Sequence, residues 1–211
     1  ISEGCDSRCS FCAIPGIRGN MRSRPAQDII DEIQSLLNRG IVEINLVGQD
    51  SASYGMDGAN PIKKEIWSQF DGTGDKKSPL CQLLEGISKL EGKFWVRLLY
   101  IHPDHFPLDI LPVMVADPRL LPYFDIPFQS GSDPIIKAMN RIGTGQEYTE
   151  LVQKLKAQTW NPCLGGAAVR STFLVGFPGE TEENATDTLN FITAIEPDWA
   201  GSFTYSKEED T

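Results

Sequence analysis

The stretch Val169-Arg170-Ser171-Thr172-Phe173-Leu174-Val175 is rich in β-branched and aromatic side chains, which is typical of a strand. Residues 176–180, which include two glycines and a proline, follow it directly. Thr181 then opens a helical pattern that carries Leu189 and Ile192. A strand, a turn and a helix in this order form the repeating unit of an α/β fold.

The same unit recurs along the chain. Further strands are expected at residues 43–48, 94–100, 123–128 and 201–205, with residues 1–4 as the stub of a sixth. Helices are expected to begin at Pro25, Pro79, Leu108, Pro134 and Thr144, where Glu147 completes a capping box. Parallel neighbours need a crossover, and helices supply it. Six units fall short of the eight in a closed barrel, so we predict an α/β fold, a partial (βα)6 TIM-like barrel with parallel strands.

The length of 211 residues suits one domain. Residues 55–78 contain several glycines, mixed charge and no periodicity, so they are expected to form a loop insertion. The chain begins at Ile1 without an initiator Met and ends in an acidic stretch. We therefore interpret it as a segment of a longer protein.

Charge and hydropathy narrow the classes of partner. The 19 basic and 29 acidic side chains give a formal net charge of -10, which repels a polyphosphate backbone and makes nucleic acid an unlikely partner. No apolar run reaches the roughly 18 residues of a membrane span, and the start does not resemble a signal peptide. A cytoplasmic location is expected.

Three of the five cysteines, Cys5, Cys9 and Cys12, lie within eight residues. An iron-sulfur cube normally takes four thiolates, so three leave one iron open to a small molecule. A structural zinc site is the alternative, although such sites usually have four Cys or His ligands and the only histidines are His102 and His105. Cys81 and Cys163 are isolated and are expected to be packed or idle.

Loops at the carboxyl ends of parallel strands carry the chemistry of such folds. Five stretches should therefore meet at one mouth: residues 5–12, 48–50, 100–105, 129–132 and 176–180. Arg170 shares strand parity with Thr172, so it should face the barrel interior if that residue does. A buried guanidinium there requires an anion, either a ligand carboxylate or Asp125. Arg97 is expected to pair with Asp125 or to lie near the substrate.

The cysteine spacing, with Phe11 before the last cysteine, resembles the signature of the radical S-adenosylmethionine (radical SAM) superfamily. Within it, the stretches 1–19, 48–50, 173–180 and 203–206 are similar to the methylthiotransferase family, so the resemblance covers essentially the whole chain. The family chemistry implies a [4Fe-4S] cluster on Cys5, Cys9 and Cys12, whose open iron chelates S-adenosylmethionine. It also implies a second cluster in an amino-terminal methylthiotransferase domain and a carboxyl-terminal TRAM-like domain, both outside this chain.

The resemblance implies roles for the residues at the mouth. Phe11 would cover the adenine, with Val175 and Gly176 on its other side. Gln49 and Asp50 would meet the cofactor amino group. Gln129 and Ser130 would reach the ribose or carboxylate, unless they only build a turn. The candidates for cofactor binding are thus Phe11, Gln49, Asp50, Gln129, Ser130, Arg170, Val175 and Gly176, and the candidates for substrate contact are Tyr100, His102 and Asp104.

Two branches of that family differ in substrate. Residues 97–106, Asp50 and the acidic end look like the RimO-type branch, which modifies the β-carbon of an aspartate in ribosomal protein uS12. Residues 129–133 look more like the branch that modifies a tRNA adenosine. We expect the protein-modifying branch, with tRNA methylthiolation and a zinc-stabilised interaction domain as alternatives. An electron donor such as flavodoxin or ferredoxin is expected.

Overall fold

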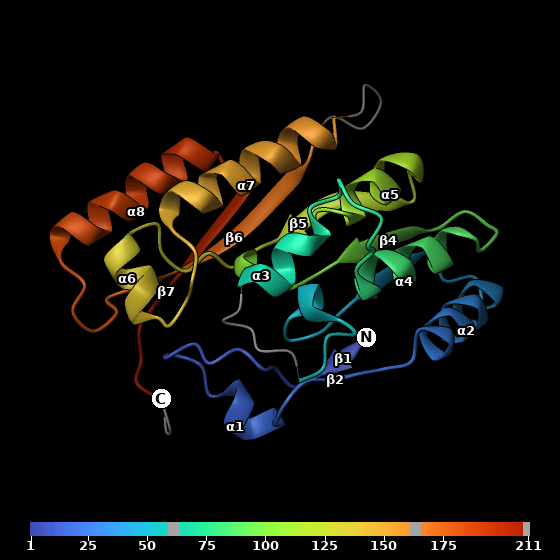
Figure 1. Ribbon diagram of the computed structural model, residues 1–211, viewed down its shortest axis with the longest axis horizontal. Helices are drawn as coiled ribbons and strands as arrows, with labels where there is room; N and C mark the ends of the chain where they lie inside the picture. The colour runs from blue at the N-terminus through green and yellow to red at the C-terminus, as the bar shows by residue number, and fades with distance from the viewer. Residues whose placement is uncertain (59–63, 161–165, 209–211) are drawn as a thin grey trace.

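A five-stranded parallel sheet forms the centre of the computed structural model, which describes residues 1–58, 64–160 and 166–208. The strand order follows the sequence, β3-β4-β5-β6-β7, and every neighbouring pair is parallel (Figure 1). The strands are β3 (Glu43–Leu46), β4 (Trp95–Leu98), β5 (Leu120–Asp125), β6 (Ala168–Val175) and β7 (Trp199–Thr204). The predicted α/β partial barrel with parallel strands is confirmed.

One face of this sheet carries the core. The covering helices, which follow one another across Figure 1, are α2 (Ala26–Asn38), α4 (Pro79–Ser88), α5 (Ile110–Ala116), α7 (Gly145–Gln158) and α8 (Glu182–Ile195). Alternate strand residues, such as Leu46, Val96 and Phe124, are buried beneath them because successive side chains of a strand point to opposite faces.

The other face of the sheet is open. Trp95, Trp199 and Phe203 are 53%, 70% and 67% exposed, and Trp199 and Phe203 share a face with Arg170 through the β6–β7 register. Within the described part of the chain, this face therefore has no second layer of helices. It is the interior side of the partial barrel.

The predicted sixth strand is wrong as a member of this sheet. β1 (Ser2–Glu3) pairs antiparallel with β2 (Arg22–Ser23) in a separate two-stranded sheet. The extended segment is short because Gly4 turns the chain with φ of 72°. The amino group of Ile1 donates to the Val47 carbonyl at 2.7 Å, just beyond the end of β3.

Short helices complete the fold. They are α1 (Ile14–Arg18), η1 (Ser51–Ser53), α3 (Lys64–Trp67), η2 (Ser68–Phe70), η3 (Pro103–His105) and α6 (Asp133–Ala138). The insertion expected to be a loop thus contains α3 and η2, with Trp67 and Phe70 buried. Of the described helices, none is long and apolar enough to cross a membrane.

The helix caps show why the helices begin where they do. Thr144 accepts the backbone N–H of Glu147, but the Glu147 carboxylate binds Lys64 instead of closing the predicted capping box. A complete box lies at α8, where Thr181 and Asn184 bond to each other's backbone N–H groups.

Candidate functional site

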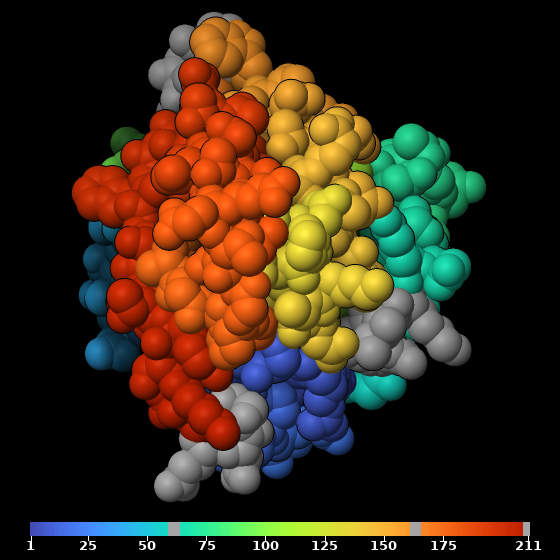
Figure 2. Space-filling view, turned by 90° about the vertical axis from the view of Figure 1, so that its left-hand side faces the viewer, coloured from blue at the N-terminus to red at the C-terminus, as the bar shows by residue number. Residues whose placement is uncertain are grey.

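The cysteine loop, residues 5–12, is clamped onto the carboxyl end of α6. The Ser10 backbone donates to the Met139 carbonyl at 3.1 Å, and its hydroxyl donates to the Ala138 carbonyl at 2.8 Å. The Asn140 amide donates back to the Arg8 carbonyl at 2.7 Å. Figure 2 shows the amino-terminal segment in blue packed beneath α6 in yellow and the chain that follows β6 in orange.

The amino-terminal end of this loop, at Cys5 and Asp6, is held by hydrogen bonds to residues 19–21. The Cys5 N–H donates to the Gly19 carbonyl at 3.2 Å, and the Asp6 carboxylate accepts the N–H of Met21 at 3.0 Å. Gly4 must be glycine, since a Cβ there would lie 2.3 Å from the Asn20 carbonyl oxygen. The loop is therefore shaped by protein contacts along its whole length.

The three thiols influence one another electrostatically. Burial raises the pKa of the Cys5 thiol to about 11, and the nearby Asp50 carboxylate adds to the rise. Burial also raises the pKa of Cys9, while the Arg141 guanidinium opposes it and Cys12 adds to it. Each raised pKa means that the free thiol is favoured until a cation or metal compensates the buried thiolate.

A zinc site is not preformed here. Among the residues that the structure describes, no three His, Cys, Asp or Glu side chains lie close enough together to hold a single metal ion. Zinc draws its sulfur ligands to about 2.3 Å from one point. In the described part of the chain, the three cysteines therefore do not form a ready-made site for a single zinc ion.

Arg141 is a charged residue of this site that the sequence analysis missed. It is buried, its Nη1 donates to the carbonyls of Pro127 and Phe128 at 2.7 and 3.0 Å, and its guanidinium lies 5.8 Å from the centre of the Phe11 ring. Its Nε is buried without a hydrogen-bond partner. A buried cation needs an anion, and thiolates with an anionic cluster would supply one, so these residues fit an iron-sulfur centre.

His102 faces the cysteine loop, and its side chain is largely buried there. Its side chain is 10% exposed, and its Nε2 lies 3.8 Å from the Cys9 sulfur. Its ring stacks on His105, with centroids 4.4 Å apart, and His105 stacks on Trp67 at 4.5 Å. Burial, followed by His105 and Arg141, lowers the pKa of His102 to about 3.

The carboxylates of Asp50 and Asp104 are both hydrogen-bonded to other groups of the protein. Asp50 is 2% exposed and accepts bonds from the Ser53 hydroxyl and from His105 Nδ1, at 2.5 and 2.7 Å. Although burial acts in the opposite direction, His105 holds the pKa of Asp50 below its ordinary value. Asp104 accepts the Tyr148 hydroxyl at 2.7 Å and two backbone N–H groups, from residues 142 and 143. These contacts favour structural roles over the ligand and substrate contacts expected from the sequence.

Two neighbouring strand ends carry unusual backbone conformations. Tyr100, after β4, has φ of 58°, and Gln129, after β5, has φ of 69°. Residues other than glycine rarely adopt such angles, which cost about 1–3 kcal/mol each and cluster at functional sites. Tyr100 is 48% exposed and Gln129 is partly buried, so both remain available to a ligand.

Gln49 and Ser130 differ in what their side chains do. The Gln49 carbonyl oxygen is buried without a hydrogen-bond partner, as a group kept for a ligand would be. Ser130 is fully buried, lies 3.1 Å from the Thr188 hydroxyl and accepts the N–H of Ser132. It builds the turn, which was the second possibility for this residue.

Arg170 has one of its two expected partners, Asp125, whereas Arg97 does not pair with Asp125. Arg170 pairs with Asp125 at 3.3 Å, but its side chain is 45% exposed, so the premise of a buried guanidinium is wrong. Burial raises the pKa of Asp125, and Arg170 partly offsets this. Arg97 pairs with Glu43 at 3.2 Å and lies over the Tyr123 ring, so its expected pairing with Asp125 is also wrong. Arg170 can still reach a ligand on the open face.

Phe11, Val175 and Gly176 lie where β6 ends. Phe11 and Leu174 pack against a small cluster of Ile135, Met139 and Phe177, which joins the cysteine loop to the chain after β6. Val175 is 39% exposed. Gly176 has φ of 75° and open space on the side where a Cβ would stand. Val175 and Gly176 are therefore accessible at the end of β6.

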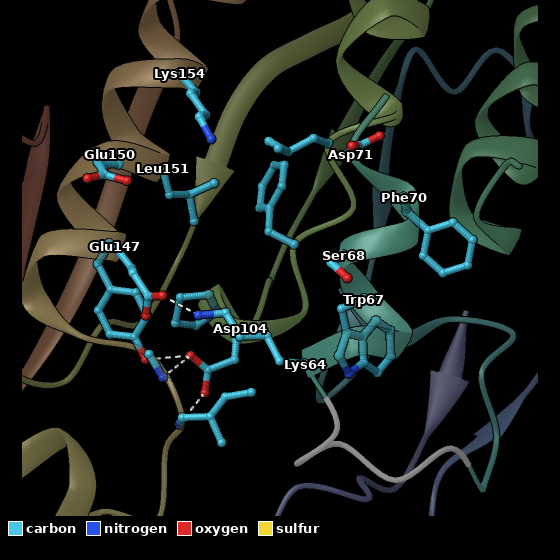
Figure 3. A pocket seen from close by; sticks show the side chains of 16 residues that line it. Lys64, Trp67, Ser68, Phe70, Asp71, Asp104, Glu147, Glu150, Leu151 and Lys154 are labelled. Carbon is cyan, nitrogen blue, oxygen red and sulfur yellow. Dashed lines mark hydrogen bonds and ion pairs between the residues drawn. The ribbon is translucent and has the colours of Figure 1, made fainter. Parts of the chain in front are cut away.

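A cavity of about 270 Å³ lies elsewhere, between the insertion and α7. Figure 3 shows Trp67 and Phe70 on one side, Leu151 and Lys154 on the other, and the hydrogen-bonded Asp104 between them. No residue of the cysteine loop lines it. Its size does not make it the site, because the thiols and the strained strand ends lie apart from it.

The remaining cysteines stay outside the site as far as the structure describes them. Cys81 is buried in α4, and its sulfur lies 3.4 Å from the Asp109 carbonyl. Cys163 lies outside the described residues.

Comparison with known sequences finds a matching superfamily and similar curated proteins. A model of the radical SAM superfamily matches residues 1–192. The "Ribosomal protein uS12 methylthiotransferase RimO" of Treponema denticola is 52% identical over 213 residues, covering 100% of this chain and 44% of the relative. The protein of the same name from Thermotoga maritima is 38% identical over 211 residues, with the same coverage. The chain thus spans less than half the length of these curated relatives.

Solved structures agree in fold. The radical S-adenosylmethionine methyltransferase TsrM from Kitasatospora setae, with cobalamin and a [4Fe-4S] cluster bound, matches with a TM-score of 0.63 at 16% identity, over 96% of this chain and 33% of that chain. The cobalamin-dependent S-adenosylmethionine radical enzyme OxsB matches with a TM-score of 0.62 at 15% identity, over 90% of this chain and 25% of that chain. At such identities the similarity concerns the fold alone.

Proposed function

Because the chain belongs to the radical SAM superfamily, we propose that Cys5, Cys9 and Cys12 hold a [4Fe-4S] cluster whose fourth iron binds S-adenosylmethionine. The observation that carries this proposal is the position of the cysteine loop, which is clamped beside strand ends that hold exposed or unpartnered groups. When bound and reduced, the cluster supplies the electron that breaks a sulfur–carbon bond of the cofactor.

The residues around the loop would bind and orient the cofactor. The unpartnered Gln49 oxygen would accept a bond from its ammonium group, and Arg170, half exposed beside Asp125, would attract its carboxylate. Phe11, Val175 and Gly176 would line the adenine, and Gln129 would approach the ribose. Tyr100, which is exposed beside them, would contact the substrate.

For the whole protein we propose RimO-type methylthiotransferase activity, in which a C–H bond at the β-carbon of an aspartate in ribosomal protein uS12 is replaced by a methylthio group. Identity of 52% over the whole of this chain, which corresponds to 44% of the Treponema denticola protein, supports this substrate, as does the net charge of -10. A second cluster and a further substrate-binding domain would belong to the longer protein, and an electron donor such as flavodoxin or ferredoxin would be a separate partner.

Anaerobic reconstitution of the 211-residue segment tests the first proposal. With dithionite and S-adenosylmethionine, the loaded segment should release methionine and 5′-deoxyadenosine without transferring a methylthio group. A segment with full iron and sulfide content that releases neither product would refute it.

The substrate is tested on the longer protein. Offered uS12 and tRNA separately, it should add the mass of a methylthio group to uS12 only. Modification of tRNA instead would assign the protein to the other branch and refute the proposed substrate.

A further inference from the structure

The tautomer of His102 follows from its contacts. Its Nδ1 accepts the backbone N–H of Asp104 at 3.2 Å, so a neutral ring carries its proton on the other nitrogen. That nitrogen, Nε2, lies 3.8 Å from the Cys9 sulfur. The ring is therefore oriented with a donor toward Cys9.

The ring has little freedom to turn away. It lies in a stack with His105 and Trp67, and the Asp50 carboxylate fixes His105 at 2.7 Å. Trp67 comes from the insertion, so three separate parts of the chain hold one imidazole in place. Contacts of this kind hold the groups around a metal centre in fixed orientations, and these orientations influence the properties of the metal.

The charge around the loop is asymmetric. Cys9 has the His102 donor and the Arg141 guanidinium close by, with the Asp104 carboxylate and Cys12 acting more weakly against them, whereas Cys5 lies near the Asp50 carboxylate and has no such cation among the described residues. Arg141 is held by two backbone carbonyls, and its Nε has no partner. Of Cys5 and Cys9, Cys9 is therefore the cysteine beside which added negative charge is better stabilised.

We propose that His102 donates an N–H bond to the Cys9 thiolate and, together with Arg141, raises the reduction potential of the cluster, an inference that rests on the proposed cluster site. Reduction transfers one electron from an external one-electron donor to the oxidised cluster, with no bond made or broken. The added charge strengthens the hydrogen bond and the attraction of the guanidinium. Hydrogen bonds to sulfur are among the factors that set cluster potentials. His102 is a positioning residue and does not exchange a proton in this step.

The test is a redox titration of the anaerobically reconstituted protein, followed by electron paramagnetic resonance. His102→Phe keeps a ring for the stack but has no N–H. At a fixed potential its ratio of reduced to oxidised cluster should be about tenfold lower, which for a one-electron couple is a midpoint about 59 mV more negative. Arg141→Met should shift the midpoint in the same direction. Tyr54→Phe removes a buried hydroxyl that bonds the Arg24 carbonyl away from the loop and should leave the midpoint unchanged.

A His102→Phe protein with full iron and sulfide content and an unchanged midpoint would overturn the inference. If that variant does not load, the native protein labelled with ¹⁵N-histidine decides the matter, since the chain has only two histidines. Pulsed electron paramagnetic resonance of the reduced cluster should then detect a histidine nitrogen, and its absence would also overturn the inference. Failure of the native protein to form any cluster would instead refute the proposed function.

Discussion

Three glycines around the cysteine loop provide a graded test of how the protein shapes this loop. Gly16 lies in α1 with no positive φ and open space around it. Gly19 has φ of 75° and also has open space. Gly4 has φ of 72°, and a Cβ there would meet the backbone oxygens of Asn20 and Gly19 at 2.3 and 2.6 Å. Substitution by Ala therefore adds neither backbone strain nor a clash at Gly16, backbone strain alone at Gly19, and both strain and a clash at Gly4.

The expected losses in unfolding free energy follow from these differences. Gly16→Ala should be neutral or stabilise by up to about 1 kcal/mol, because Ala favours a helix. Gly19→Ala should cost about 1–3 kcal/mol from backbone strain alone. Gly4→Ala adds a backbone clash of about 1–3 kcal/mol to a strain of about 1–2 kcal/mol, so about 2–5 kcal/mol is expected.

Urea unfolding of the three variants measures these costs, and iron and sulfide analysis after anaerobic reconstitution measures the loop itself. Gly4→Ala should lose most of its cluster, since the same clash displaces the carbonyl that accepts the Cys5 N–H. Equal stability and equal iron content of Gly4→Ala and Gly19→Ala would refute the reasoning.

Three further predictions concern neighbouring groups. Trp67→Ala should cost about 3–5 kcal/mol because it removes a buried ring, whereas Trp95→Ala on the open face should cost much less; equal losses in urea unfolding would contradict this. Burial alone would raise the pKa of Asp104, but contacts with His102 and Tyr148 hold it below its ordinary value. Its stabilising contribution is therefore present above an unfolded pKa of about 3.9 and is lost as the pH falls below that value. Asp104→Asn should make stability less dependent on pH below about 4, and an unchanged slope there would count against this. Gln49→Leu should weaken S-adenosylmethionine binding to the loaded protein about tenfold in calorimetry, since it removes the unpartnered oxygen, and unchanged binding would exclude that role.

The sequence predicted the alternation of strands and helices well because apolar periodicity is a local property. Ile29 and Ile33 of α2 and Leu83 and Leu84 of α4 are buried as their spacing requires. The prediction of a sixth strand in the main sheet was wrong. Residues 2–3 do form a strand, but Gly4 turns the chain, and the strand pairs with β2 instead. Strand pairing is a tertiary choice that local pattern does not fix.

The site was only partly predictable for the same reason. The spacing of the cysteines placed the loop, but the role of His102 depends on a contact with Cys9 across 93 residues of chain. Arg141 stands between Asn140 and Ile142 shortly after α6, and nothing in this local sequence distinguishes it from an exposed arginine. Asp50 and Ser130 follow strands as ligands would, yet their neighbours in space occupy their oxygens.

The hydrogen bonds by which Ser10 and Asn140 join the cysteine loop to α6 affect what happens to the protein when it is exposed to oxygen. Small zinc domains lose their fold with their metal because the metal is their core. Here the loop keeps its shape through the peptide itself. If oxygen destroys the cluster, the loop should therefore keep its conformation. Iron and sulfide could then be reinserted without refolding of the chain.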